Sequence, residues 1–230
     1  MAAIIIQARL TSTRFPNKIL EIIGEKPGLF HVIDQCLSSL ANKVVLAVPN
    51  SQFDNFKSIM KDYENQHHKK LLLHNGSENN VLKRFCEATK HLDEEVIVRI
   101  TSDCFLINRH HIDKTVDYFN NHDFDYVNNS TVTRVLSADQ PDDYQSDTST
   151  PDGFNVEVFK KSVLLEAAEN AIEKYDIEHV TPWIKRNKVC KVFDTGKISL
   201  KGKFSIDNPE DLDIIKALYT LIVNDRITFE

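Results

Sequence analysis

A basic loop near the start of the chain is the first group of residues that could do chemistry. Residues 7–18 include Arg9, Arg14 and Lys18, and no acidic residue precedes Glu21. One guanidinium group can bind two phosphate oxygens through two parallel hydrogen bonds, and a lysine ammonium adds a compact positive charge. The loop therefore predicts a site for a phosphate-bearing ligand, with a basic surface loop that binds nothing as the simpler alternative.

Two aspartates lie where a cation would be held against such phosphates. Asp103 follows an apolar run at residues 96–100, and Asp207 follows a short predicted strand that begins at Phe204. Mg²⁺ takes one or two carboxylates and completes its octahedron with phosphate oxygens and waters. We expect Asp103 and Asp207 to hold Mg²⁺, although an aspartate after a strand is also a common turn or capping residue.

The chain lacks the common phosphate-binding fingerprints. It contains no G-x-x-x-x-G-K-[ST] and no G-x-G-x-x-G pattern, which argues against a P-loop and a Rossmann dinucleotide site. Asp123-Phe124-Asp125 matches the D-x-D pattern of glycosyltransferases, but it falls at an expected helix-to-strand turn, where aspartate is frequent. A glycosyltransferase that uses a finished sugar nucleotide is the alternative enzyme class, because one layered α/β fold can host both chemistries; it would bind its metal at Asp103 or at the Asp123–Asp125 pair.

A sheet must position these side chains, because short apolar runs alternate with helical patterns. Strands are expected at residues 3–8, 44–48, 71–74 and 96–100, with helices between them around residues 29–40 and 81–88. Further helices are expected at residues 109–121, 161–174, 177–187 and 209–224. The alternation predicts an α/β fold with an open, mostly parallel sheet, in which ligands bind beyond the carboxyl ends of the strands.

The composition narrows the classes of protein that fit. The 230 residues are 41% hydrophobic and 27% charged with a net charge of −6, which argues against a dedicated nucleic-acid binder. No apolar run approaches the ~20 residues that cross a membrane, and no signal peptide is recognisable, so a cytoplasmic protein is expected. Four scattered cysteines indicate reduced thiols rather than a zinc or disulfide framework. We expect one catalytic domain over residues 1–230.

One segment interrupts the alternation. From residue 135 to residue 159 there is no Lys or Arg but there are six acidic residues. Long segments without regular structure inside a domain are usually lids, binding loops or arms. We interpret residues 129–154 as an inserted arm that acts as a lid or a dimer contact, with a solvated insertion as the alternative.

Several short motifs, taken in order, resemble one family. The matching segments begin with Ile4-Ile5-Ile6-Gln7-Ala8-Arg9, Ser12-Thr13-Arg14, Pro16 and Lys18; they continue with Gly76-Ser77-Glu78, Arg99-Ile100-Thr101 with Asp103, Pro151-Asp152-Gly153 with Glu157, Glu178-His179-Val180-Thr181-Pro182, and Ile206-Asp207 with Pro209-Glu210-Asp211-Leu212. Together they resemble the CMP-sugar-acid synthetase (cytidylyltransferase) superfamily, in its spore coat polysaccharide biosynthesis branch.

The resemblance implies a three-layer fold of the nucleotide-diphospho-sugar transferase, or GT-A-like, kind, and a homodimer that transfers CMP from CTP to a small acidic sugar. It implies that Arg14, Lys18, Asp103 and Asp207 act in catalysis, with Mg²⁺ on the two aspartates. The nucleotide would lie against Gln7, Arg9, Ser12, Arg14, Lys18, Gly76, Ser77 and Arg99. By position, Asp152, Asn155, Glu157, Glu178 and His179 would line the sugar side.

The chain departs from the family pattern at four positions. Thr11 and Ser102 stand where glycine is usual, Phe105 where proline is usual, and Asn155 where aspartate is typical. None of these removes an expected phosphate or metal ligand, so they bear on the acceptor more than on the reaction. A non-enzymatic nucleotide-binding subunit is disfavoured, because every expected ligand is present.

Overall fold

The computed structural model describes residues 1–67, 69–130, 150–195 and 203–223. Its centre is a seven-stranded sheet with the strand order β5-β4-β1-β6-β8-β7-β9. The strands are β1 (Ala2–Gln7), β4 (Lys43–Pro49), β5 (Leu71–Gly76), β6 (Val96–Thr101), β7 (Tyr126–Asn128), β8 (Glu157–Lys160) and β9 (Cys190–Val192). A separate two-stranded hairpin pairs β2 (Ile22–Ile23) with β3 (Lys26–Pro27).

The sheet is mostly parallel, as predicted. Strand β1 pairs in parallel with β4 and β6, β4 with β5, and β7 with β9, whereas β8 runs antiparallel to β6 and β7. The four predicted strands are confirmed to within two residues as β1, β4, β5 and β6. Their parallel order brings the carboxyl ends of β1 and β6 to the same edge of the sheet.

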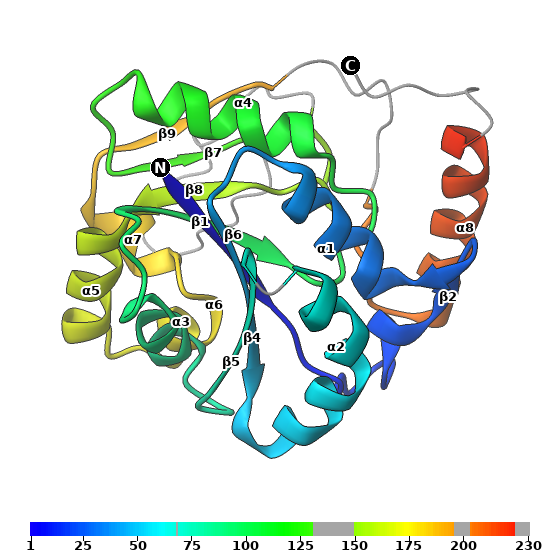
Figure 1. Cartoon of the computed structure of the whole chain (residues 1–230). Helices are drawn as coiled ribbons and strands as arrows, with labels where there is room; N and C mark the ends of the chain where they lie inside the picture. Colours follow the sequence, from blue (N-terminus) through cyan, green and yellow to red (C-terminus); the bar gives the residue numbers. More distant parts are fainter. Residues whose placement is uncertain (68, 131–149, 196–202, 224–230) are drawn as a thin grey trace.

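Eight helices cover the sheet in the described part of the chain. They are α1 (Gly28–Ser38), α2 (Phe53–His67), α3 (Val81–Thr89), α4 (Arg109–Asn120), α5 (Lys161–Asn170), α6 (Lys174–His179), α7 (Pro182–Asn187) and α8 (Pro209–Val223), with 3-10 turns η1 (Lys18–Leu20) and η2 (Asn50–Gln52). The apolar residues of α1, α2, α4 and α8 share one buried cluster, and those of α3, α5 and α7 share another. These clusters lie on opposite faces of the sheet, which gives the predicted three layers (Figure 1).

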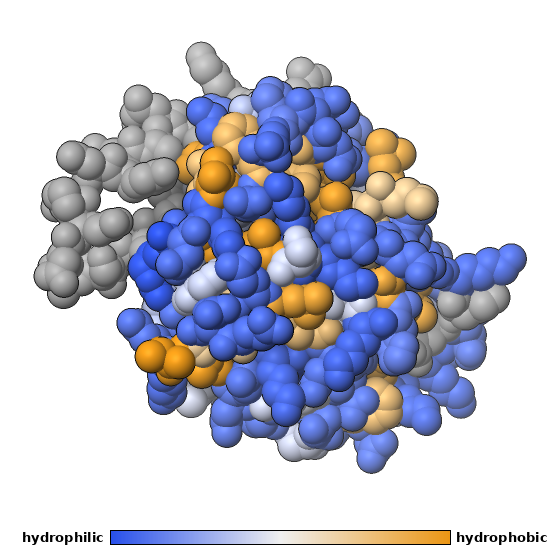
Figure 2. All heavy atoms as spheres, turned by 90° about the vertical axis from the view of Figure 1, so that its left-hand side faces the viewer, coloured by the Kyte–Doolittle hydropathy of each residue, from blue (hydrophilic) through white to orange (hydrophobic). Residues whose placement is uncertain are grey.

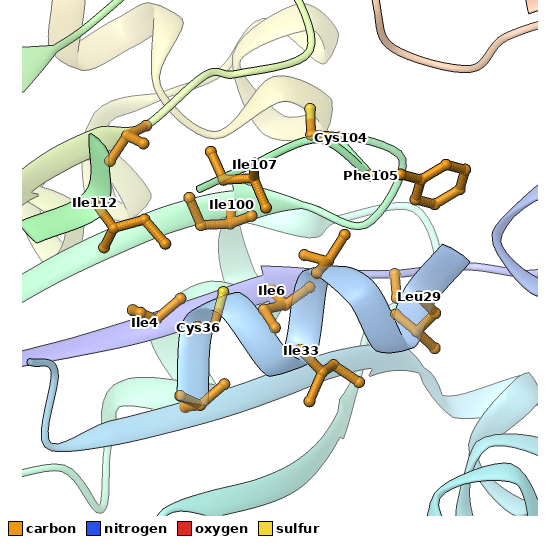
Figure 3. Packing of buried hydrophobic residues seen from close by; sticks show 14 of the residues in the cluster. Ile4, Ile6, Leu29, Ile33, Cys36, Ile100, Cys104, Phe105, Ile107 and Ile112 are labelled. Carbon is orange, nitrogen blue, oxygen red and sulfur yellow. The ribbon is translucent and has the colours of Figure 1, made fainter. Parts of the chain in front are cut away.

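Alternation along β1 fills both layers. Ile4 and Ile6 belong to the first cluster and Ile5 to the second, and all three are fully buried. In Figure 3, Ile4 and Ile6 lie between the Cys36 side of α1 and the loop that follows β6. Burying an isoleucine side chain contributes about 1.5–3 kcal/mol, so this packing holds the start of the basic loop and the loop after β6 against one rigid layer.

Three predicted elements differ from the structure. The helix expected at residues 177–187 is two short helices, separated by Val180 at a φ of 71°. The helix expected at residues 161–174 ends at Asn170. The strand expected before Asp207 is wrong, because this segment makes an isolated bridge between Asp152 and Lys203 and no strand.

Helix α2 was not predicted, although the sequence carries a signal for it. Phe53, Phe56, Met60 and Tyr63 recur at helical spacing, with Phe56 and Met60 fully buried. Most residues between them are polar, so the apolar stripe is narrow and the helical pattern is weak.

The ends of the segment at residues 129–154 are built into the fold. Asn129, Ser130, Thr150 and Phe154 are at most 2% exposed. The expected arm itself, residues 131–149, lies outside the described residues.

The described helices include none that is both long and apolar enough to cross a membrane. Figure 2 shows the side of the molecule on which α5 and α7 lie, where apolar residues are scattered among hydrophilic ones. Scattered apolar residues of this kind are ordinary on protein surfaces.

Candidate active site

A cleft of about 250 Å³ lies at the carboxyl ends of β1 and β6. It is lined by Gln7, Arg9, Ser12, Thr13, Arg14, Lys18, Ile19, Thr101, Ser102, Asp103, His179 and Asp207. The lining includes eight residues predicted from the sequence to lie at the site, among them both aspartates and all three cations of the basic loop. Parallel strands account for this gathering, since the loops after β1 and β6 leave the sheet side by side.

Backbone turns and one buried glutamine hold the basic loop in shape. Asn17 has a left-handed φ of 58° and donates its backbone N–H to Leu10 O at 2.9 Å. Gln52, 6% exposed, accepts from the Leu10 N–H at 2.6 Å and donates to Thr11 Oγ1 at 2.9 Å. Sequence reasoning missed Gln52; its place just beyond the carboxyl end of β4, at the same edge as the loop, was the available signal.

Lys18 joins the two aspartates. Its Nζ lies 2.6 Å from Asp103 Oδ2 and 3.4 Å from Asp207 Oδ1, and it also donates to the backbone oxygen of Ile206. One ammonium therefore contacts side chains that are 104 residues apart in sequence, counted from 103 to 207. The side chain of Lys18 is 11% exposed, so this contact is shielded from much of the solvent.

Asp207 is surrounded by further cations. Arg14 Nη2 lies 2.9 Å from Asp207 Oδ1, and Lys203 Nζ lies 2.7 Å from Asp207 Oδ2. Burial alone would raise the pKa of Asp207, but Lys203, Lys18 and Arg14 together hold it below its ordinary value. The carboxylate is therefore ionised at neutral pH.

The segment that carries Asp207 is anchored on residues 152–155. Phe204 N–H donates to Asp152 O at 2.8 Å, and Ser205 Oγ donates to Asp152 Oδ2 at 2.8 Å. Gly153 has a φ of 102°, and a Cβ there would lie 2.4 Å from the Phe204 carbonyl carbon. Asn155 Nδ2 donates to Asp152 Oδ1 at 3.1 Å. Asp152 and Asn155, expected on the sugar side, are absent from the cleft lining and instead hold this segment.

Glu157 sits in a buried ionic network next to the cleft. Its carboxylate pairs with Arg99 Nη1 and with Lys185 Nζ at 2.8 Å, and accepts from Tyr126 Oη at 2.6 Å and Thr181 Oγ1 at 2.8 Å. Burial would raise the pKa of this carboxyl, but Lys185 and Arg99 outweigh burial and hold the pKa well below its usual range. The same burial, beside the Glu157 charge, raises the pKa of Tyr126.

This network reaches the cleft through one hydrogen bond. Arg99 Nη2 donates to Gln7 Oε1 at 3.2 Å, and Gln7 lines the cleft. Arg99 and Glu157 were expected at the nucleotide and the sugar respectively, but neither lines the cleft. Their partners Tyr126, Thr181 and Lys185 were not predicted, because local sequence gives no sign that α7 packs over β8.

The remaining predicted residues lie beside the cleft. Gly76 ends β5, and its ideal Cβ position lies 2.8 Å from Arg84 Cγ, while Arg84 Nη1 donates to Ser77 O at 3.1 Å. Burial lowers the pKa of Arg84 to about 10. Gly76, Ser77 and Glu178 are absent from the lining, although Glu178 adjoins the lining residue His179.

The D-x-D motif does not reach the cleft. Lys160 Nζ binds Asp125 Oδ1 at 2.8 Å and Asp123 Oδ1 at 3.3 Å. Asp125 Oδ2 also accepts from the Val189 N–H at 3.2 Å. Both aspartates therefore serve the turn between α4 and β7, as expected for aspartates in turns.

The four cysteines are free thiols. Cys104 follows Asp103 but is 2% exposed, and burial raises the pKa of its thiol. A thiol that stays protonated and inaccessible is a poor nucleophile.

The donor set of the cleft fits a hard divalent cation. Asp103 and Asp207 supply carboxylate oxygens that both contact Lys18, and no group of three His, Cys, Asp or Glu side chains suited to a metal occurs in the described chain. Two carboxylates match Mg²⁺, whose other positions are usually filled by waters and phosphate oxygens.

A three-layer α/β domain with a basic loop after β1 and paired aspartates at the same sheet edge defines the class of nucleotidyltransferase-like proteins. The cytidylyltransferase family model matches residues 3–223, and the chain belongs to this family. The resemblance described from the motifs is thereby confirmed.

The chain is similar to several known proteins. It is 35% identical over 191 residues to uncharacterized protein MJ1063 of Methanocaldococcus jannaschii, covering 82% of this chain and 69% of the relative. It is 26% identical over 231 residues to the spore coat polysaccharide biosynthesis protein SpsF of Bacillus subtilis, covering 94% and 85%.

A third relative is the 3-deoxy-manno-octulosonate cytidylyltransferase of Haemophilus influenzae (strain PittGG), 32% identical over 103 residues. That match covers 44% of this chain and 38% of the relative. The solved structure of a cytidylyltransferase from Leptospira borgpetersenii covers 100% of this chain with a TM-score of 0.77 at 21% identity, which confirms the fold.

Proposed function

We propose that this chain transfers CMP from CTP to a hydroxyl of an acidic sugar, releasing pyrophosphate, in the synthesis of a surface polysaccharide precursor. The family membership supports the CTP-dependent transfer. The names of two relatives, a spore coat polysaccharide protein and a 3-deoxy-manno-octulosonate cytidylyltransferase, support the acidic sugar and the pathway class. The observation that carries the proposal is the ammonium of Lys18 shared between Asp103 and Asp207 in one cleft, with Arg14 bound to the same Asp207.

In the proposed reaction the acceptor hydroxyl attacks the α-phosphorus of CTP in line, and pyrophosphate leaves. Phosphoryl transfer asks the protein mainly for positioning and charge neutralisation. Arg9, Arg14 and Lys18 bind the triphosphate oxygens and stabilise the charge that develops on the departing pyrophosphate. Gln52 keeps this loop in place through Leu10 and Thr11.

Asp103 and Asp207 would hold Mg²⁺ in this scheme. When bound, the ion supplies charge neutralisation at the phosphate oxygens. The aspartates are also paired with Lys18, Arg14 and Lys203, which balance their negative charge. The triphosphate brings the further negative charge that a divalent ion needs.

The glycosyltransferase alternative loses its main support. It would take its metal on Asp103 or on the Asp123–Asp125 pair, and the pair is held by Lys160 outside the cleft, which leaves Asp103 alone. A homodimer and a cytoplasmic location, both expected from the sequence, stay predictions.

The test is a pyrophosphate-release assay with CTP, Mg²⁺ and a panel of 2-keto-3-deoxy sugar acids that includes 3-deoxy-manno-octulosonate. We expect pyrophosphate and a CMP-sugar from at least one acid, and loss of both in Asp103→Asn. Asp123→Asn is the matched control and should keep full turnover. Release of a nucleoside diphosphate from a sugar nucleotide instead would overturn the proposal in favour of a glycosyltransferase.

A further inference from the structure

His179 is a cleft residue with an available imidazole. It is the last residue of α6, its side chain is exposed, and it lines the same cleft as Asp103 and Arg14. Its ring lies against Tyr175, with the ring centroids 4.4 Å apart. Within the part of the chain that the structure describes, no hydrogen bond engages either ring nitrogen, so both can meet a substrate.

The backbone directly after His179 is strained. Val180 has φ 71° and ψ −54°, and Thr181 N–H donates to His179 O at 2.8 Å. This is a γ-turn with positive φ, a rare and strained conformation. A β-branched residue is a strong outlier there, and such strain persists only where surrounding structure over-determines it.

Contacts on both sides of the turn hold the strain in place. Val180 is fully buried and donates its N–H to Asp176 O at 2.9 Å. Thr181 Oγ1 donates to Glu157 Oε1 at 2.8 Å, which ties the turn to β8. A strained valine is not needed merely to end helix α6, because a glycine at this position would end the helix without strain. The turn therefore fixes His179 relative to the sheet edge where the aspartates lie.

Among the residues that line the described cleft, His179 is the one whose side chain is a base that can be uncharged near neutral pH. The other basic side chains in the lining are Arg9, Arg14 and Lys18, and Lys18 contacts both aspartates. Asp207 in addition carries Arg14 and Lys203. These groups suit charge neutralisation, and an imidazole suits proton removal.

We propose that His179 is the general base that removes the proton from the attacking acceptor hydroxyl. The oxygen–hydrogen bond of the hydroxyl breaks, its proton moves to an imidazole nitrogen, and its oxygen forms a bond to the α-phosphorus. The bond from the α-phosphorus to the bridging oxygen breaks, and pyrophosphate leaves with that electron pair. The proposal rests on the proposed CMP transfer and adds a catalytic residue to it.

The surroundings of His179 favour the neutral, proton-accepting form. Partial desolvation lowers its pKa, Arg99 on β6 and Lys185 on α7 lower it further, and Glu178 and Glu157 oppose this by raising it. The net result is a pKa below the ordinary value of 6.5. At neutral pH the imidazole is therefore free to accept a proton.

The test compares wild type with His179→Gln and His179→Ala under the pyrophosphate-release assay across about pH 5 to 8, where imidazoles titrate. We expect His179→Gln to lower kcat by about 10²–10⁴-fold, with the KM for CTP within about threefold of wild type. The acidic limb of the wild-type kcat profile should disappear in this variant. His179→Ala should regain turnover with added imidazole, in proportion to its unprotonated fraction.

The control is His110→Gln, an exposed histidine at the start of α4, which should keep the wild-type profile. An unchanged kcat and acidic limb in His179→Gln would overturn the proposal and leave CMP transfer standing. A lower kcat that retains the acidic limb and shows no imidazole rescue would also overturn it, since a structural role predicts that pattern. If wild type turns over no sugar acid, the proposed function itself fails.

Discussion

Replacing Glu157 with glutamine should destabilise the protein strongly. Glu157→Gln keeps the size of the side chain and an oxygen for Tyr126 and Thr181, but it removes the negative charge. Arg99 and Lys185 would then face each other with side chains only 14% and 15% exposed and no carboxylate between them. Leaving buried charge without its partner is among the most costly single changes in a protein.

The magnitude follows from the burial of the network. Glu157 is 8% exposed at its side chain, so solvent screening relieves little of the loss. Removing one partner of a buried ion pair costs about 3–5 kcal/mol. For a domain of this length, 1 kcal/mol shifts Tm by about 2–4 °C, so we expect a fall of roughly 6–20 °C.

The assay is urea unfolding at neutral pH, with Glu166→Gln as the matched control. Glu166 also pairs with a lysine, Lys188, at 2.6 Å, but its side chain is 47% exposed, and exposed pairs contribute about 0–1 kcal/mol. A loss below about 1 kcal/mol in Glu157→Gln, equal to the control, would refute the reasoning that this network is a buried ionic centre.

The pH dependence of the unfolding free energy gives a second test of the role of Glu157. Because the pKa of Glu157 is depressed in the folded state, its stabilisation is fully present above the ordinary value of 4.5 and is lost as pH falls through the folded-state pKa. The difference in unfolding free energy between wild type and Glu157→Gln should therefore persist at about pH 5 and shrink only at lower pH.

Three further predictions concern the cleft and the contacts that hold it together. Asp103→Asn, Asp207→Asn and Arg14→Ala should each lower kcat by about 10²–10³-fold while the thermal unfolding transition stays cooperative; near-wild-type turnover in one would remove that residue from the mechanism. Gln52→Ala should release Leu10 and raise the KM for CTP by about tenfold with little change in kcat, measured by initial rates; an unchanged KM would contradict its anchoring role. Gly153→Ala should cost about 3 kcal/mol or more in urea unfolding and reduce activity, because its Cβ would meet the Phe204 backbone at 2.4 Å; wild-type stability would show that this approach is not needed.

The parts of the site that sequence predicts are those set by chain order along the sheet. Arg14, Lys18 and Asp103 lie in the segments that come after buried parallel strands, so position and charge together place them at one edge. Asp207 lies in the cleft as predicted, yet no strand precedes it. Its position depends on Asp152 and Gly153, which hold the segment through contacts that span about fifty residues of sequence.

Other residues depend on packing that no local pattern records. Glu157 has the sequence features of a candidate sugar ligand, but Lys185 and Tyr126 occupy its carboxylate from distant elements. The division of the expected helix at residues 177–187 has no local cause either, because valine is a poor choice for positive φ. The strain at Val180 becomes visible only once tertiary contacts are known.

The fate of the α-phosphorus of CTP tests CMP transfer most directly. Wild-type protein is incubated with Mg²⁺, a 2-keto-3-deoxy sugar acid and CTP labelled either at the α- or at the γ-phosphorus, and the products are separated. CMP transfer predicts that the α-label appears in a CMP-sugar and the γ-label in pyrophosphate, with neither product formed by Asp207→Asn. Recovery of the α-label in CDP or unchanged CTP with every sugar acid would contradict it.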